Sequence, residues 1–319
     1  MASKGINLAR IAIGYWAMAP RDQDPYVQGA YKYLAQALDW ANDAGIKVMI
    51  DLHGAPGSQN GFDNSGQRGD IRWTQDNTIE ETRRAITTIR DDHASHPAVV
   101  AIELLNEPMG PQLDRGVIEQ FYYDGWGDLR DSEVAVTFSD CFLGVGDWEE
   151  FGAGMHSLLL DTHHYEVFSS GQLEMDIDTH VATSCGYGGL MAATNKWTVC
   201  GEWSGALTDC AKWLNGRGEG ARYDGTFDYN GQTSYYIGSC EGTYDNTVAG
   251  LSDVQKTNIA RFINAQMVAY ERAEGWIFWT WKNEGAPEWH FRDLVNEGLI
   301  RQPLGSYGES LSFSFLHLS

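Results

Sequence analysis

Two glutamates, each at the end of a short apolar run, are the residues in this chain best placed to do chemistry. Val99–Pro108 reads Val-Val-Ala-Ile-Glu-Leu-Leu-Asn-Glu-Pro, and Trp197–Ser204 reads Trp-Thr-Val-Cys-Gly-Glu-Trp-Ser. The first run is too short for a typical helix and lacks polar alternation, which predicts a strand that is buried on both faces, and the second is again a short apolar run that ends in a glutamate. Glu107 and Glu202 would then lie at the carboxyl ends of parallel strands, where α/β barrels place their active sites.

The spacing of the two glutamates fits an array of β-α units. They are about 95 positions apart, which corresponds to roughly three units of about 30 residues and would place them across the mouth of a closed barrel. Two carboxylates about 5 Å apart, one nucleophile and one general acid and base, are what double-displacement glycoside hydrolysis requires. A single glutamate at a strand end is often solvated and inert, but the recurrence of the pattern favours a catalytic pair.

Composition limits the class of protein and its partners. The 319 residues suit one large barrel or two ordinary domains, and because no repeat or linker interrupts them we expect a single domain over residues 1–319. The formal net charge of −22 disfavours nucleic acid and anionic membranes as partners. Twelve Trp and fifteen Tyr residues favour carbohydrate, since aromatic side chains form platforms for sugar faces.

Targeting segments and metal-binding motifs are not recognisable in this sequence. No apolar run approaches the roughly 20 residues that span a bilayer, and the first residues, Met-Ala-Ser-Lys-Gly, lack the apolar core of a signal peptide. The cysteines do not have the CxxC spacing of zinc or redox sites, so we expect no metal and no cofactor. The five are Cys141, Cys185, Cys200, Cys210 and Cys240, and their odd number leaves at least one thiol free.

Seven strands are expected, and the helical patterns between several of them predict a right-handed parallel β/α array. The strands begin near residues 7, 47, 99, 133, 157, 197 and 276. A closed barrel of this type has eight strands, so one is missing or unrecognised. Arg10 interrupts the first apolar strand, Asn7–Ile13, and a buried cation there requires a carboxylate partner.

Helix ends are recognisable at three places. The apolar residues of Tyr31–Ala41 recur at helical spacing, and Gly45 is suited to a C-terminal cap. Two further helices begin with the spacing of capping boxes, Asn77 with Glu80 and Ser252 with Gln255. The polar, Gly-rich loop 55–69 is expected at the active site, and 215–250 is expected to form an ordered surface excursion.

Five stretches of the chain resemble the fungal exo-β-1,3-glucanases of glycoside hydrolase family 5. They are Gly54–Gly69, Glu103–Pro108, His163–Phe168, Gly201–Gly216 and Gly275–Trp289, and the resemblance covers roughly residues 5–305. It implies a (β/α)8 TIM barrel, here without the first β/α unit of the family. It also implies a retaining glucan 1,3-β-glucosidase that releases glucose from the non-reducing ends of β-1,3-glucan.

The resemblance assigns roles to eleven residues. Glu107 matches the general acid and base, and Glu202 matches the nucleophile. These roles imply that the pKa of Glu107 is raised relative to that of Glu202, because the two carboxyls must hold different protonation states. The other nine match residues that contact the sugar or position the nucleophile: Arg10, His53, Phe62, Asn64, Asn106, His163, Tyr165, Phe168 and Trp281.

Within that set, Arg10 and Tyr165 match the pair that hydrogen-bonds the nucleophile, and Asn106 the residue that holds the sugar 2-hydroxyl. Phe62 and Phe168 match aromatic residues at the entrance to the site. Three choices among neighbouring residues are open to test. The motif His-x-Tyr favours His163 over His164, Trp281 is preferred as the sugar platform over Trp276 and Trp279, which we expect in the core, and Asp51 is a weaker candidate beside His53.

Where the chain departs from the family pattern, other expectations follow. The resemblance leaves Cys210 and Cys240 as a plausible disulfide, and it implies a secreted or cell-wall enzyme, which we expect to be a monomer. The divergent tail 305–319 alternates Leu311, Phe313 and Phe315 with serines, so it is expected to cover the exposed edge of the first strand or to leave that edge open. Two alternatives stand beside the β-1,3-glucanase: a β-1,4- or β-1,6-glucanase, and a glucan-binding protein without turnover.

Overall fold

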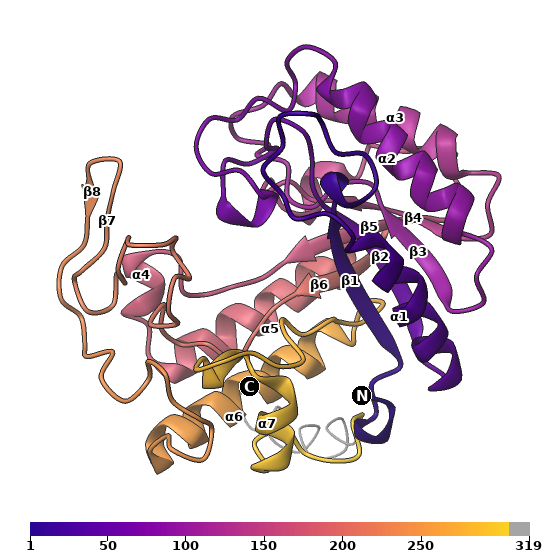
Figure 1. Ribbon diagram of the computed structural model, residues 1–319. Coiled ribbons are helices and arrows are strands. Elements are labelled where there is room, and N and C mark those ends of the chain that lie inside the picture. The colour runs from indigo at the N-terminus through magenta and orange to yellow at the C-terminus, as the bar shows by residue number, and fades with distance from the viewer. Residues whose placement is uncertain (306–319) are drawn as a thin grey trace.

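A curled, six-stranded parallel sheet forms the centre of the protein, and helices cover its outer face (Figure 1). The structure, a computed structural model, describes residues 1–305. The strands are hydrogen-bonded in chain order, which confirms the predicted parallel β/α architecture. They are β1 (Leu8–Gly14), β2 (Lys47–Gly54), β3 (Val99–Glu103), β4 (Ala135–Ser139), β5 (Leu158–His163) and β6 (Trp197–Glu202).

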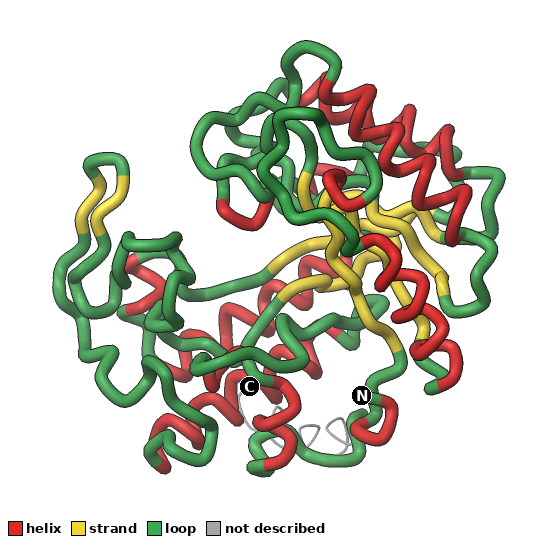
Figure 2. The backbone as a smooth tube through the Cα atoms, viewed as in Figure 1, coloured by secondary structure: helices red, strands yellow, loops and turns green. Residues whose placement is uncertain are grey.

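Helices occupy most of the connections between strands (Figure 2). The α-helices are α1 (Tyr31–Asp43), α2 (Thr78–His93), α3 (Arg115–Leu129), α4 (Ser170–Leu173), α5 (Ile177–Ala193), α6 (Asp253–Tyr270) and α7 (Phe291–Asn296). Short 3-10 turns form η1 (Ala2–Lys4), η2 (Tyr15–Ala17), η3 (Asp63–Ser65), η4 (Val145–Trp148) and η5 (Pro287–Trp289). Within residues 1–305, no helix combines the length and the apolar character needed to cross a bilayer.

The helix ends follow the sequence signals with one exception. Gly45 follows α1 at a φ of 69°, the left-handed geometry of a C-terminal cap, and the Ser252–Gln255 capping box at the start of α6 is confirmed. Helix α2 begins directly after Asn77 as expected, but the Asn77 side chain makes no capping hydrogen bond. The prediction of a capping box there is wrong because the backbone of Asn77 is not extended (φ −99°, ψ 15°).

The seventh expected strand forms only in part. The Gly275–Lys282 stretch runs parallel to β6, where the Ile277 N–H donates to the Cys200 carbonyl at 2.8 Å, but a single β-bridge joins the two. On the opposite edge of the sheet, β1 pairs only with β2 among the described residues. A cavity of about 440 Å³ lies between β1 and this stretch. The predicted strand in the tail falls on residues 306–319, outside the described part of the chain.

The inner face of the curled sheet is layered. Met49, Ala101 and Val199 form a small apolar layer, and the register places Asp51 opposite Glu103 one step further along β2 and β3. A charged layer therefore lies above an apolar floor, on the side towards the carboxyl ends of the strands. The expectation that β3 is buried on both faces is wrong at Val100, which is 37% exposed.

After β6 the chain makes a long excursion that carries the hairpin β7 (Asp228–Tyr229) and β8 (Gln232–Thr233). The expected disulfide between Cys210 and Cys240 is present. The buried carboxylate of Asp209 accepts hydrogen bonds from the backbone N–H groups of Arg222 at 2.7 Å and Tyr223 at 2.9 Å. These two anchors tie separate segments of the excursion to one another.

The packing of α5 against α6 generates a stability prediction. A Cβ added at Gly188 would lie 2.4 Å from the Ala269 carbonyl oxygen, whereas one added at Gly186 would meet nothing within 4 Å. We expect Gly188→Ala to lower the free energy of unfolding by about 1–3 kcal/mol through overpacking. Gly186→Ala should raise it by about 0.5–1 kcal/mol, because alanine is the better helix former. Urea unfolding measures both, and effects of the same sign would contradict this account of the helix contact.

Candidate active site

Glu107 and Glu202 meet at the carboxyl ends of the strands. Glu202 is the last residue of β6, whereas β3 ends at Glu103 and Glu107 lies in the turn that follows. At Glu107 the backbone has a φ of 46°, a left-handed conformation that a glutamate rarely adopts. Both side chains are buried, and one carboxylate oxygen of each, together with a nitrogen of His163, lie within 4.8 Å of one another.

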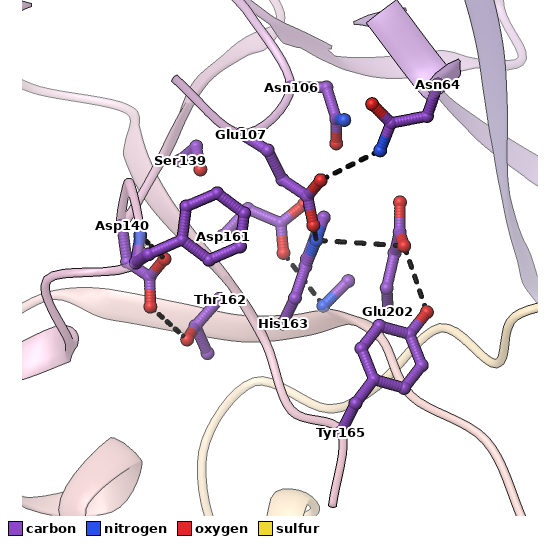
Figure 3. Close-up of polar contacts among 12 residues, drawn as sticks. Asn64, Asn106, Glu107, Ser139, Asp140, Asp161, Thr162, His163, Tyr165 and Glu202 are labelled. Carbon is purple, nitrogen blue, oxygen red and sulfur yellow. Dashed lines mark hydrogen bonds and ion pairs between the residues drawn. The ribbon is translucent and has the colours of Figure 1, made fainter. Parts of the chain in front are cut away.

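Glu107 receives two hydrogen bonds (Figure 3). His163 Nδ1 lies 2.7 Å from its Oε1, and Asn64 Nδ2, from the turn η3, donates to its Oε2 at 3.0 Å. Burial alone would raise the pKa of Glu107, but the hydrogen bond and the charge of His163 lower it below its usual value. In the ligand-free protein His163 thus outweighs the burial of Glu107, and the expected difference in pKa between the two glutamates stays a prediction.

Glu202 is held by different groups. Arg10 Nη1 lies 2.7 Å from its Oε1, and the Tyr165 hydroxyl donates to its Oε2 at 2.9 Å. Burial and the charge of Glu202 raise the pKa of Tyr165 well above its usual range, so this phenol stays protonated and keeps donating. Two donors from separate segments of the chain therefore face the two oxygens of the Glu202 carboxylate.

Arg10 is buried at the centre of the charged layer. Burial would lower the pKa of its guanidinium, but the surrounding carboxylates hold that pKa well above its usual value. The sequence required a carboxylate partner for the charged residue in the first strand, and Arg10 has several, as a buried cation must. Its partners are Glu202 at 2.7 Å, Glu103 at 2.8 Å, Asn106 Oδ1 at 2.8 Å, Asp51 at 3.2 Å and Asp161 at 3.5 Å.

More carboxyl groups than cations lie around Arg10. The pKa values of Glu103 and His163 are shifted as a result. Burial raises the pKa of Glu103 well above its usual range, and the negative charge of Asp51 adds to this although Arg10 opposes it. Burial alone would lower the pKa of His163, yet the carboxylates of Glu202 and Asp161 hold it well above its usual value. In the ligand-free site both shifts favour the protonated forms, of Glu103 through burial and of His163 through the carboxylates around it.

The structure places His163 at the two glutamates and His164 away from them, as the His-x-Tyr motif predicts. His163 faces both glutamates, with Nδ1 3.7 Å from the nearer Glu202 oxygen. His164 points away from them and stacks on Tyr187, with ring centres 4.2 Å apart. Burial lowers the pKa of His164 to about 4, so this side chain is a neutral part of the core. His53 Nδ1 lies 2.6 Å from the Asp51 carboxylate, which gives that aspartate a contact with a site residue.

Trp281 was expected at the site and Trp279 in the core, and the structure places them the other way round. Trp279 stacks on His53 with ring centres 5.6 Å apart and planes 9° from parallel, and it packs in the same cluster as Tyr165. Trp281 instead lies 6.1 Å from the Phe291 ring and packs on the main hydrophobic core. The structure therefore favours Trp279 over Trp281 at the site. Spacing alone did not reveal this, because the stretch forms no regular ladder and strand alternation is an unreliable guide there.

Exposed phenylalanines surround the opening. Phe62 is 45% exposed and Phe168 is 42% exposed, and Phe168 meets the Tyr165 ring edge-on at 5.7 Å. A third, Phe142, is 43% exposed and lies edge-on to Phe62 at 6.2 Å. Sequence reasoning missed Phe142 because it lies beyond β4, where the resemblance is weak.

Two buried acids were also missed as members of the site. Glu103 lies inside the apolar run that ends at Glu107, and its charge in a buried strand was the same signal that singled out Arg10. Asp161 precedes His163 by two residues and so shares its face of β5. The Asp161 carboxylate accepts from the Gly201 N–H at 2.8 Å, which joins β5 to β6 directly below the site.

Metal binding and proton transfer are the two chemistries to weigh for this cluster. Among residues 1–305, Glu107, His163 and Glu202 each offer one ligand atom at distances that would suit a metal ion. His163 Nδ1 already lies 2.7 Å from Glu107 Oε1, and the carboxylates of Glu202 and Asp161 raise the pKa of His163, which disfavours the neutral imidazole that a metal requires. The arrangement therefore suits proton transfer beside a nucleophilic carboxylate better than metal coordination.

Known proteins with related sequences are glycoside hydrolases. Residues 1–136 match the family model for cellulase, glycosyl hydrolase family 5. A glucan 1,3-β-glucosidase of Blumeria graminis is 51% identical over 311 residues, which cover 96% of this chain and 72% of that protein. A probable glucan 1,3-β-glucosidase A of Aspergillus niger is 48% identical over 304 residues, covering 94% of this chain and 72% of that protein.

Solved structures show the same fold at much lower sequence identity. A rutinosidase from Aspergillus niger has a TM-score of 0.67 at 18% identity, over 93% of this chain and 80% of that one. Endo-glycoceramidase II from Rhodococcus sp., in complex with a cellobiose-like isofagomine, has a TM-score of 0.55 at 15% identity, over 93% and 72%. These likenesses establish the barrel architecture.

The buried charge network generates a prediction that does not depend on function. We expect Arg10→Met to lower the free energy of unfolding by about 3–5 kcal/mol, because it leaves several carboxylates buried without their cation. Arg83 is a matched control, since it pairs with Asp128 at 2.9 Å in a part-exposed position. Arg83→Met should cost no more than about 1 kcal/mol. Urea unfolding compares them, and similar losses would show that the Arg10 network does not stabilise the fold in this way.

Proposed function

Since the chain belongs to glycoside hydrolase family 5, we propose that it is a retaining exo-β-1,3-glucanase that releases glucose from the non-reducing ends of β-1,3-glucan. The observation that carries the proposal is the approach of Glu107 and Glu202, whose nearest ligand oxygens lie within 4.8 Å. Retaining glycosidases hold their two carboxyls about 5–5.5 Å apart, whereas inverting enzymes need about 6.5–9.5 Å to admit a water molecule.

In the first step, Glu202 attacks the anomeric carbon of the terminal glucose. The glycosidic C–O bond breaks, a glycosyl ester forms on Glu202, and Glu107 donates a proton to the leaving oxygen. The ligand-free site stores that proton on His163, whose Nδ1 lies 2.7 Å from Glu107. The proton therefore has a short transfer to Glu107 once substrate occupies the site.

In the second step, the roles of the two glutamates are exchanged. Glu107, now a carboxylate, removes a proton from water, and the water oxygen attacks the anomeric carbon as Glu202 departs. The departing carboxylate regains its hydrogen bonds from Arg10 and Tyr165, which stabilise its negative charge. Two displacements at one carbon retain its configuration.

Sugar binding is assigned from the free donors and rings around the glutamates. Asn106 accepts from Arg10 through Oδ1, while its buried Nδ2 has no partner among the described residues, and we assign it to the sugar 2-hydroxyl. Trp279, supported by His53, replaces Trp281 as the proposed platform for the reacting glucose. The exposed rings of Phe62, Phe142 and Phe168 are assigned to the sugar that follows.

The relatives' names favour β-1,3-glucan over the β-1,4 and β-1,6 linkages. We further propose that the protein acts as a single-domain monomer, outside the cell or in the cell wall. The Cys210–Cys240 disulfide is consistent with an oxidising compartment. The net charge of −22 argues against nucleic acid and anionic membrane as partners.

Linkage preference and turnover are tested together by glucose release. We expect laminarin, a β-1,3-glucan, to yield glucose faster than the β-1,4-glucan cellulose or the β-1,6-glucan pustulan. Equal rates on all three would remove the linkage assignment. Binding of laminarin oligosaccharides without glucose release would instead identify a glucan-binding protein.

The roles of the two glutamates predict different responses to substitution. Glu202→Gln should abolish turnover on every substrate, because no covalent intermediate can form. Glu107→Gln should lose ~10²–10⁴-fold on laminarin, the usual contribution of general acid catalysis, but far less on aryl glucosides with good leaving groups. Rates of glucose and phenol release measure this, and equal losses on both substrates for the two variants would contradict the assignment.

A further inference from the structure

Arg68 joins two loops that are far apart in the sequence. Its Nη2 lies 2.8 Å from Glu219 Oε1, and its guanidinium carbon lies 4.4 Å from the centre of the Tyr229 ring in β7. The guanidinium also packs closely against Gly216, where an added Cβ would be 2.9 Å from it. One side chain thus makes an ion pair, a cation–π contact and a backbone contact across the same junction.

Both loops begin at the carboxyl end of the sheet. Arg68 lies in the loop that follows β2, and Glu219 lies in the excursion that follows β6. The strand order places β3, β4 and β5 between them on one side, and β1 and the Gly275–Lys282 stretch lie on the other. The Arg68–Glu219 pair therefore spans the mouth of the curled sheet, and Figure 1 shows the two segments on opposite sides of it.

The bridge divides the mouth into two unequal parts. On the β3–β5 side, the exposed rings of Phe142 and Phe168 follow β4 and β5, and this side is open to solvent. Glu107 follows β3, and Glu202 ends the neighbouring strand β6. A glucan that enters past the phenylalanines meets the bridge behind the reacting sugar.

Both ends of the bridge are held in place. On the β2 side, Ser58 and Ser65 exchange a hydrogen bond at 2.7 Å, and Asn64 ties the same loop to Glu107 at 3.0 Å. On the β6 side, the Glu219 carbonyl accepts from the Asp228 N–H at 3.0 Å, and the Cys210–Cys240 disulfide closes the base of the excursion. The loops are thus positioned independently of a ligand.

From this geometry we propose that Arg68 is a specificity-determining residue: its ion pair with Glu219 closes one end of the active-site mouth, so that β-1,3-glucan reacts only at its terminal glucose. The inference rests on the proposed glucanase function and deepens it. Without the bridge, a chain can lie across the site with sugars on both sides, and internal bonds become accessible to Glu107 and Glu202.

The test uses linear β-1,3-glucan oligosaccharides whose ends have been oxidised with periodate and reduced with borohydride. Periodate cleaves vicinal diols, which the terminal residues have and the internal β-1,3-linked residues lack. An enzyme that acts only at ends cannot use this substrate. Cleavage of internal bonds releases shorter oligosaccharides, which chromatography quantifies beside glucose release from the untreated oligosaccharides.

We expect the unaltered protein to release glucose from the untreated substrate and nothing from the oxidised one. Arg68→Ala and Glu219→Ala should each increase oligosaccharide release from the oxidised substrate roughly fivefold or more above the detection floor, in keeping with the loss of one part-exposed ion pair. The charge-reversed double variant R68E/E219R should restore terminal action. Arg72→Ala is the matched control, because Arg72 lies in the same loop and pairs only with the exposed Asp70 among the described residues.

Each result decides a different claim. If both single variants release no more oligosaccharide than the unaltered protein, the bridge does not set terminal specificity and the inference is overturned while the proposed function stands. If the unaltered protein itself cleaves the oxidised substrate, the proposed exo action fails and the inference fails with it. Glu219→Ala keeps the test valid should Arg68→Ala not fold, because it removes the same ion pair from the other side.

Discussion

The structure depends on one buried cation. Arg10 extends from β1 into the interior of the curled sheet, where its partners come from β2, β3, β5 and β6. A guanidinium taken out of water must be surrounded by acceptors, and acceptors on four strands surround it only if the sheet curls around it. Glu202 is one of these partners, and the turn that carries Glu107 follows β3, whose last residue, Glu103, is another.

The two glutamates differ in their neighbours rather than in their depth. Glu202 is contacted by the guanidinium of Arg10 and the hydroxyl of Tyr165, which donate to its two oxygens. Glu107 is contacted by His163, whose proton can move to it across 2.7 Å. Two chemically identical side chains, both buried, therefore have different hydrogen-bonding neighbours, which supports the different roles proposed for them. The lowered pKa of Glu107 in the ligand-free site reflects where the shared proton rests before substrate arrives.

The position of Arg10 also exposes a weakness of this sheet. The strand that carries it pairs with β2 alone within residues 1–305, and a cavity of about 440 Å³ separates it from the Gly275–Lys282 stretch. Edge strands ordinarily present unpaired backbone groups. Here the side chain of Arg10 ties the edge strand to the interior, because detaching the strand would leave buried carboxylates without a cation.

Local pattern determined most of the elements and singled out Glu107 and Glu202, because short apolar runs that end in a glutamate are typical of a parallel sheet with polar groups gathered at one end. The family resemblance added the contacts of Arg10, Asn64 and Tyr165, and His-x-Tyr distinguished His163 from His164. Only the tertiary structure decided between Trp279 and Trp281, added Phe142, Glu103 and Asp161 to the site, and joined Arg68 to Glu219. Each of these depends on where loops or strands distant in sequence meet, and on the proton balance of a charge cluster, quantities that no local spacing contains.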